Sequence, residues 1–356
     1  MVALYASSLG LPEALIGLVV SSYAVVPILA AIPLGSLLNA WGRRRAMLVG
    51  AAGMMAAGLV YALTPPLPLL VLVQAVSGTC ELLTWVALQT LVSEWGPEHT
   101  RARTVGYFSL FSSAGEAFGP FVGGLLISWG GFSLAFKGYG LMASLAFLAA
   151  LAAPRDAPAP QGRPAHEATP WAQAWDVLRN PYIQLSLLTS FIILFVNDIC
   201  STFYPIFLQN ERKMSVALIG TLLSTRGLAQ VVVRPLVGYM VERWGLLRTM
   251  LASTLLGIVG ITATPLLHSV YLLAAFMLIT GLGTGLNMPL SVLMIAHHTE
   301  YRDRGVGMSL RLIVNRAAHL VNPILFGVIS QFFSLASGFY VVGLSCWKVW
   351  LPLLGK

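Results

Sequence analysis

The chain has 356 residues, of which 57% are hydrophobic and 10% are charged, and its formal net charge is +8. A soluble domain carries about 25% charged residues, so the composition excludes an ordinary soluble protein, which needs more polar surface. The apolar residues come in blocks of roughly 20 to 28, long enough to cross a hydrocarbon core of about 30 Å as helices. Strand-like alternation is absent, and unpaired backbone groups are not tolerated in lipid, so the expected fold class is an all-α membrane protein.

Eleven membrane spans are predicted in chain order, near residues 14–40, 46–64, 67–92, 104–129, 132–153, 182–208, 216–241, 247–266, 269–296, 305–331 and 338–355. The loops on one side carry only Arg212 and Lys213. The loops on the other side carry Arg43, Arg44, Arg45, Arg101, Arg103, Arg155, Arg163, Arg179, Arg243, Arg248, Arg302 and Arg304. Arginine-rich loops stay in the cytoplasm, so we expect a multi-pass protein of the cytoplasmic (inner) membrane. The basic charge is explained by topology, and no nucleic-acid partner is expected.

One long polar loop divides the chain. It holds the Pro-rich segment PRDAPAPQGRPAHEATP and then WAQAWDVLRN. Residues 154–181 are therefore predicted to be a cytoplasmic linker that ends in a short interfacial helix. The linker separates an N-terminal bundle, residues 1–153, from a C-terminal bundle, residues 182–356.

The two halves are related by an internal repeat with an offset of 203 residues. The aligned segments are Ala14-Leu15-Ile16-Gly17 with Ala217-Leu218-Ile219-Gly220, then Gly35, Trp41, Gly42 and Arg45 with Gly238, Trp244, Gly245 and Arg248, and Gly78 with Gly281. One offset that serves three segments indicates a tandem duplication, as in many transporters. The span at 182–208 has no counterpart in the first half, so we expect two pseudo-symmetric bundles with about 11 helices, twelve minus the first.

The loop after the first span resembles a known signature. GSLLNAWGRRR is similar to the helix 2–3 motif G-x-L-a-D-r-x-G-r-r of the major facilitator superfamily, except that Asn39 occupies the acidic position and Ala40 the next basic one. The resemblance implies the superfamily's fold. It also implies a conformational latch of loop cations and a helix-end acid. Its residues would be Gly35, Asn39, Gly42, Arg43 and Arg45, and in the second half Gly238, Glu242, Arg243, Gly245 and Arg248. The alternative is that the arginines serve topology alone.

The span at 104–129, helix 5 in the superfamily's numbering, is rich in glycine. It fits the pattern G-x8-G-x3-G-P-x2-G-G of the superfamily's antiporters with Gly106, Gly115, Gly119, Pro120, Gly123 and Gly124. Glycines lower helix propensity but allow close packing, and a Gly-Pro step allows a bend. A plain Gly-rich packing helix is the alternative. Gln74 stands where proton-exchanging members often have Arg, so the motifs alone do not establish proton coupling.

Polar and ionisable residues inside the spans form the candidate site, because a charge at the bilayer centre costs roughly 2.5–3.5 kcal/mol and persists only for a reason. Arg311, Asn315, His319 and Asn322 share one helical face and form a polar stripe, which we expect to face the cavity between the bundles. The candidates for substrate binding or proton coupling are Glu81, Glu116, Asp198, Arg226, Asn287, Arg311, Asn315, Arg316 and His319. Two interpretations stay open: permanent acid–base pairs across the interface, or groups that bind substrate and exchange a proton, with Glu81 or Glu116 as the carrier. Lys348 falls in the middle of the last predicted span, so either that span is misplaced or the tail is not original.

These features predict a transporter and not an enzyme. No paired Asp-rich metal motif, nucleophile elbow or nucleotide loop is present, and Cys80, Cys200 and Cys346 lack metal or redox spacing. We expect a monomeric secondary transporter that moves a small organic solute across the lipid bilayer by alternating access, most simply by proton-coupled efflux, with no cofactor and no metal. One alternative is organic-anion uptake by a symporter or facilitator, suggested by the basic second half. Another is a non-functional remnant or sensor, suggested by the missing helix.

Overall fold

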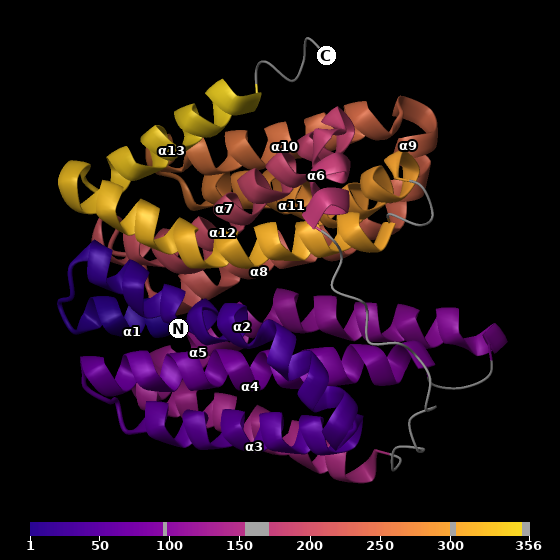
Figure 1. The fold of residues 1–356 in the computed structure, drawn as a ribbon. Helices are drawn as coiled ribbons and strands as arrows, with labels where there is room; N and C mark the ends of the chain where they lie inside the picture. Colours follow the sequence, from indigo (N-terminus) through magenta and orange to yellow (C-terminus); the bar gives the residue numbers. More distant parts are fainter. Residues whose placement is uncertain (95–97, 154–170, 300–303, 351–356) are drawn as a thin grey trace.

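The computed structural model describes residues 1–94, 98–153, 171–299 and 304–350. In the first half the helices are α1 (Val2–Ser8), α2 (Glu13–Trp41), α3 (Arg43–Ala62), α4 (Leu67–Glu94) and α5 (Glu98–Ala152). They are followed by α6 (Trp171–Arg179), α7 (Pro181–Asn210), α8 (Val216–Val233), η1 (Arg234–Leu236), α9 (Val237–Trp244), α10 (Leu246–Thr262), η2 (Thr264–Leu266), α11 (Val270–His298), α12 (Arg304–Phe333) and α13 (Leu335–Trp350). Figure 1 shows α3, α4 and α5 on one side of the molecule and α7, α10, α11 and α13 on the other.

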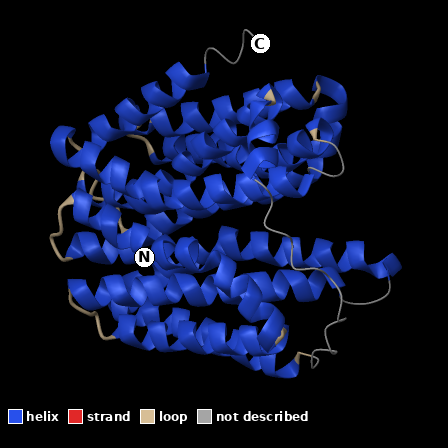
Figure 2. Cartoon of the chain, viewed as in Figure 1, coloured by secondary structure: helices blue, strands red, loops and turns tan. Residues whose placement is uncertain are grey.

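The expected all-α membrane fold is confirmed. The described residues contain no strand (Figure 2), and eight of their helices are long and apolar enough to cross a membrane. One of these, Leu110–Ala152, holds two predicted spans, because α5 is kinked at Gly130 and at Gly131, where φ is 70°. The remaining two predicted spans correspond to α2, whose described apolar part is Glu13–Ile28, and to α13, which has 16 residues.

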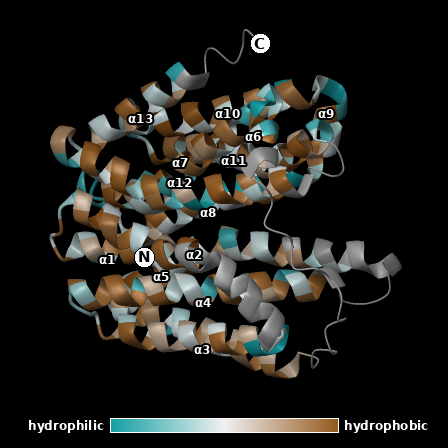
Figure 3. Ribbon diagram, in the orientation of Figure 1, coloured by the Kyte–Doolittle hydropathy of each residue, from teal (hydrophilic) through white to brown (hydrophobic). Residues whose placement is uncertain are grey.

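The outward faces of the helices are apolar. Figure 3 shows hydrophobic residues along α3, α13 and the other outer helices. Large side chains such as Leu59, Leu141 and Leu344 are about 60% exposed. So much exposed apolar surface is rare on a soluble monomer, whereas lipid solvates it without cost. Lys348 is exposed and lies in the last described turn of α13, where its long stem can carry the charge toward the interface; the rest of the predicted span lies outside the described residues.

The short helix α1 is an element that the sequence analysis missed. Ala3, Leu4, Tyr5 and Ala6 are buried, and the helix packs against α2 and α7. The side chain of Asn210 at the end of α7 donates a hydrogen bond to Ser7 Oγ at 3.2 Å, and these two residues are 203 positions apart. α1 is therefore the counterpart of the last turns of α7, so the first half contains the end of the helix that was expected to be missing.

The internal repeat also appears in the contacts between the halves, where α2 packs on α12 and α8 packs on α5. A Cβ built on Gly220 would lie 2.5 Å from the carbonyl oxygen of Pro120, and one built on Gly17 would strike the carbonyl of Pro323. Gly220 follows Gly17 by 203 residues, and Pro323 follows Pro120 by the same number. Only glycine permits backbones to approach so closely, so glycines at repeat-related positions define both interfaces.

A second pair of glycines completes the two interfaces. A Cβ on Gly124 would lie 2.7 Å from the carbonyl oxygen of Val216, and one on Gly327 would lie 2.5 Å from that of Glu13. These pairs also obey the offset of 203. Because α2 and α8 begin at this end and the arginine-rich loops lie at their other end, the close contacts join the halves at the end away from the arginine-rich loops.

Candidate substrate and proton site

A carboxylate, an imidazole and an amide meet between α7 and α12. One Asp198 carboxylate oxygen lies 2.8 Å from Nδ1 of His319, and the other accepts a hydrogen bond of 2.9 Å from Nδ2 of Asn322. His319 and Asn322 are three residues apart and therefore share a face of α12. The Asp198 side chain is 11% exposed and that of His319 is 37% exposed. The cluster thus holds two groups that can take up a proton, one buried and one open to the space beside it.

A second polar cluster lies in the first half. The Tyr23 hydroxyl of α2 donates a hydrogen bond to the Glu81 carboxylate of α4. Beside it the Ser77 and Tyr139 hydroxyls are 2.9 Å apart, and the Tyr61 hydroxyl donates to the side chain of Gln74. Hydroxyl groups from α2, α3 and α5 therefore surround α4, which carries Glu81, and satisfy its polar side chains.

The two clusters lie on either side of the boundary between the halves, and the charges of Glu81 and Arg316 both contribute to the electrostatic environment of His319. Glu81 belongs to α4 and Arg316 to α12, so the site includes opposite charges from both halves. Since charges so placed attract or repel as the halves move, their interaction depends on the conformation.

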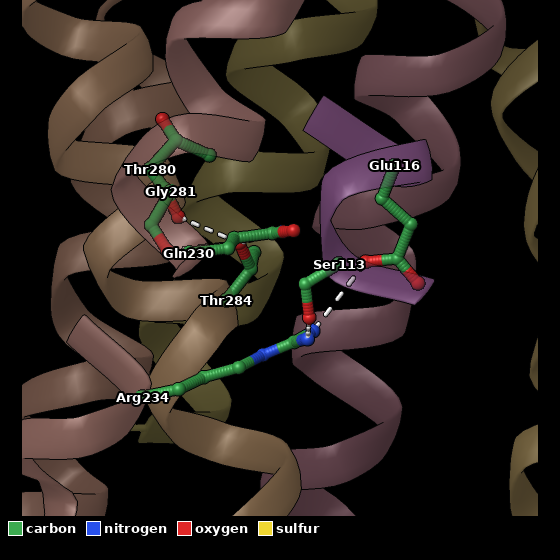
Figure 4. A network of polar contacts seen from close by, with 7 residues as sticks. All are labelled: Ser113, Glu116, Gln230, Arg234, Thr280, Gly281 and Thr284. Carbon is green, nitrogen blue, oxygen red and sulfur yellow. Dashed lines mark hydrogen bonds and ion pairs between the residues drawn. The ribbon is translucent and has the colours of Figure 1, made fainter. Parts of the chain in front are cut away.

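A third polar contact joins α5 to η1 (Figure 4). Arg234 donates hydrogen bonds to Ser113 Oγ and, at 3.4 Å, to Glu116 Oε2. The Glu116 side chain is 57% exposed and that of Arg234 is 26% exposed, and such partly exposed pairs contribute at most about 1 kcal/mol. Nearby, Gln230 donates to Thr284 at 2.8 Å. Glu116 therefore has a cationic partner in the other half, but one that it can release.

Arg226 differs from the other buried cations. Its Nε and Nη1 are buried and have no hydrogen-bond partner among the described residues, although the side chain lies against the thiol of Cys200. It lines a cavity of about 220 Å³ between α1, α5, α7 and α8. Of the described residues that line this cavity, Arg226 has the only charged side chain and Ser201 the only other polar one. The surroundings of the guanidinium are thus mostly apolar and hold no counter-charge among the described residues.

The polar stripe predicted on α12 faces more than one direction. Nε of Arg311 donates to Ser291 of α11 at 2.8 Å, and Asn322 is fully buried against α7. Both therefore pack inside the second half, so the expectation that the whole stripe faces the space between the halves is wrong for these two residues. Oδ1 of Asn315 and Nδ2 of Asn287 are buried and have no hydrogen-bond partner in the described part of the chain.

The motif glycines at the arginine-rich end have matching backbones. Gly42 has φ 79° and Gly245 has φ 85°, and each lies directly before the next helix, α3 or α10. This left-handed region favours glycine, which explains the motif position in both halves. Arg44 bonds the carbonyl oxygens of Ala150 and Leu151 at the end of α5, so at least one loop arginine secures a neighbouring helix.

Within the described residues, the predicted latch of the second half contains no acid–base pair. Glu242 is exposed and makes no ion pair with any described residue, and Arg243 donates a hydrogen bond of 3.4 Å to the Tyr239 hydroxyl. Arg45, Arg248 and Gly238 are exposed as well. The side chain of Asn39, together with Gly35 and Gly106, lies outside the residues whose surroundings are described.

The glycine pattern on α5 divides into two groups. Cβ atoms built on Gly115 and Gly119 would meet no described atom within 4 Å, whereas Gly123 would meet the Met1 side chain and Gly124 would meet α8. Pro120 also contacts α8, through Gly220.

Within the described residues no group of three or more His, Cys, Asp or Glu side chains is arranged to hold a metal ion.

Sequence reasoning missed Tyr23, Ser113 and Arg234 as members of these clusters. The repeat register contained a signal for the first, because Tyr23 precedes Arg226 by 203 residues. The same offset relates Glu116 to His319. Each polar position in one half therefore marks a position worth inspecting in the other.

A chain of membrane-spanning helices that holds acids and bases between its two halves defines a multi-pass membrane transporter. More particularly, the chain belongs to the Major Facilitator Superfamily, whose family model matches residues 1–214 and 186–347. It is accordingly a transporter of small molecules and not an enzyme.

Similar proteins include a drug-resistance protein and an efflux pump. The chain is 24% identical over 353 residues to the tetracycline resistance protein, class G, of Vibrio anguillarum, covering 96% of this chain and 87% of that protein. It is 28% identical over 115 residues to the efflux pump azaK of Aspergillus niger, covering 32% of this chain and 24% of the pump. Among solved structures, the nucleoside transporter NupG has a TM-score of 0.83 at 13% identity, covering 99% of this chain and 93% of NupG. At that identity the likeness shows the fold alone.

Proposed function

We propose that this protein exports a small organic solute from the cytoplasm in exchange for protons. The observation that carries the proposal is the place of the antiporter-type glycine pattern of α5. Pro120 and Gly124 of that pattern form the contact with Gly220 and Val216 of α8. A sequence pattern typical of antiporters thus lies at the interface where the halves would move against each other. The tetracycline resistance protein and the efflux pump azaK, both similar to this chain, support the same direction of transport.

The energy source in this proposal is the proton gradient, and the carriers are carboxylates. Glu81 bonds Tyr23, Glu116 pairs with Arg234, and Asp198 pairs with His319. Protonation of a carboxylate removes its attraction to a cation. It also lowers the free-energy cost of carrying the group through an apolar environment, because the group is then neutral. Glu116 is the carboxylate most directly linked to movement, because its partner belongs to the other half. In this scheme the protein is a monomer of the cytoplasmic membrane, residues 154–181 lie in the cytoplasm, and no cofactor is needed.

The test is solute accumulation by inverted membrane vesicles with an acidic interior. Tetracycline, the solute named by the Vibrio anguillarum relative, heads a panel of amphipathic solutes. We expect accumulation that a protonophore abolishes. Glu81→Gln or Glu116→Gln should lose it while solute binding is retained. Glu211→Gln, an exposed carboxylate at the end of α7, serves as the matched control and should behave like the wild type.

Two results would overturn the proposal. One is the failure to see proton-driven accumulation, either because no solute of the panel accumulates or because accumulation does not respond to the protonophore. The other is unchanged proton-driven accumulation in both glutamate variants, which would show that Glu81 and Glu116 are not the proton carriers and leave permanent ion pairs as their role.

A further inference from the structure

The guanidinium of Arg226 is a half-buried cation that has no counter-charge among the described residues. No described carboxylate forms an ion pair with it, and its Nε and Nη1 lack hydrogen-bond partners in the described part of the chain. The neighbouring acids are engaged elsewhere, since Asp198 uses both carboxylate oxygens on His319 and Asn322. A charge inside a membrane protein is costly unless something binds it, so two of the three guanidinium nitrogens are left unsatisfied among the described residues.

A second unsatisfied group lies close to the first. The hydroxyl of Tyr204 is buried and has no described hydrogen-bond partner, and its neighbour on α7, Pro205, lines the same cavity as Arg226. Tyr204 belongs to α7, one turn after Cys200, whose thiol contacts the guanidinium. Two separate donors, one charged and one neutral, are therefore unpaired in the same region between α7 and α8.

The cavity beside Arg226 has room for only part of a solute. Its volume is about 220 Å³, below the roughly 300–1,000 Å³ of a complete ligand pocket. Ile219 and Leu223 of α8 and Leu4 of α1 make its wall apolar. The cavity can therefore hold the apolar part of a solute whose oxygen atoms face the guanidinium of Arg226.

We propose that Arg226, with the Tyr204 hydroxyl as a second donor, binds a carboxylate of the transported solute, whose apolar part occupies the adjoining cavity. This inference rests on the proposed function as a transporter and adds the chemical class of the solute, an amphipathic organic anion. The planar guanidinium offers two parallel N–H donors that match a carboxylate. The carboxylate supplies the missing counter-charge, and the apolar wall favours acids with aromatic bodies over small hydrophilic ones.

The experiment measures binding and not transport, using purified full-length protein in detergent. The probes are acetate, benzoate and 1-naphthoate, each compared with its neutral amide, and the readout is the shift of Tm with concentration. We expect 1-naphthoate to raise the Tm more than 1-naphthamide, and the larger acids to act at lower concentration than acetate. The acid preference should disappear in Arg226→Gln and persist in Arg179→Gln, an exposed arginine of α6.

Two further variants keep the test decisive if Arg226→Gln does not fold. Arg226→Lys keeps the positive charge but loses the two parallel N–H donors of the guanidinium. Tyr204→Phe removes only a hydroxyl that has no described hydrogen-bond partner. Each should raise the concentration of 1-naphthoate needed for half the Tm shift by about tenfold, and Tyr204→Phe should leave the Tm of the free protein unchanged or higher.

The inference is overturned if no acid in the panel stabilises the protein more than its amide, or if the acid preference survives in the Arg226 variants. Neither result bears on proton exchange. Conversely, a protein that binds 1-naphthoate through Arg226 but shows no proton-driven accumulation would contradict the proposed export and leave this binding site intact.

Discussion

Substitution of Gly17 or Gly220 should shift the protein away from the conformation described here. A Cβ on Gly17 would strike the carbonyl of Pro323, and one on Gly220 would lie 2.5 Å from that of Pro120. These neighbours are backbone atoms, so the helices must separate to admit a valine. Overpacking of this kind costs about 1–3 kcal/mol, and the cost applies only while these helices are in contact. The ratio of open to closed forms at this end should therefore rise roughly 5- to 150-fold.

The assay is a distance distribution between spin labels at this end of the molecule. Cysteines introduced at Leu63, in the loop after α3, and at His268, in the loop after η2, are both exposed and lie on different halves. A Cys80→Ser background is suitable, because Cys80 is less buried than Cys200 and Cys346. We expect Gly17→Val and Gly220→Val to increase the population with the longer distance.

Gly115→Ala and Gly119→Ala are the matched controls, because a Cβ at either position would meet no described atom within 4 Å. Alanine in a helix should even add about 0.5–1 kcal/mol of stability over glycine, without a change in the distances. The reasoning is refuted if Gly17→Val and Gly220→Val fold normally and leave the distance distribution as it is in the wild type.

Three further predictions concern stability. Gly42→Ala and Gly245→Ala should each cost about 1–3 kcal/mol, because φ is 79° and 85° with ψ at 162° and 154°, a region that is essentially limited to glycine; unchanged Tm values would contradict this. Asn322→Ala removes a hydrogen bond to the buried Asp198 carboxylate and should cost about 1–3 kcal/mol in thermal unfolding, so a neutral result would mean that Asp198 has another donor. A double-mutant cycle of Arg234→Gln and Glu116→Gln should give a coupling energy below about 1 kcal/mol, since Glu116 is 57% exposed; a value above about 2 kcal/mol would indicate a pair too strong to act as a switch.

The helices were predictable because the membrane imposes their length and the loops carry the remaining polarity. The junction predicted between 129 and 132 lies at Gly130 and Gly131, where the backbone leaves helical geometry. α1 was missed for the same reason, because a helix of seven residues is too short to register as a span.

The candidate site was only partly predictable. Depth along a span can be estimated from sequence, so Asp198 and His319 were both identified, but their direct contact depends on how α7 crosses α12. The same limit explains why Arg311 was assigned to the space between the halves although it bonds Ser291 of α11. Helical spacing shows which face of a helix a residue occupies. Which other helix lies against that face depends on how the helices pack. The contact of Arg234 with Ser113 and Glu116 could not be predicted, because it depends on how α5 packs against the second half.

The most direct test of proton-coupled export is proton movement that accompanies solute movement in liposomes containing only this protein. The liposomes hold a pH-sensitive dye and have an acidic interior, and a transported solute is added outside. We predict that the interior becomes more alkaline as the solute enters, with at least one proton leaving per solute, and that a Glu81→Gln, Glu116→Gln double variant shows no such change. Solute entry at the wild-type rate without any change in internal pH would contradict proton-coupled export.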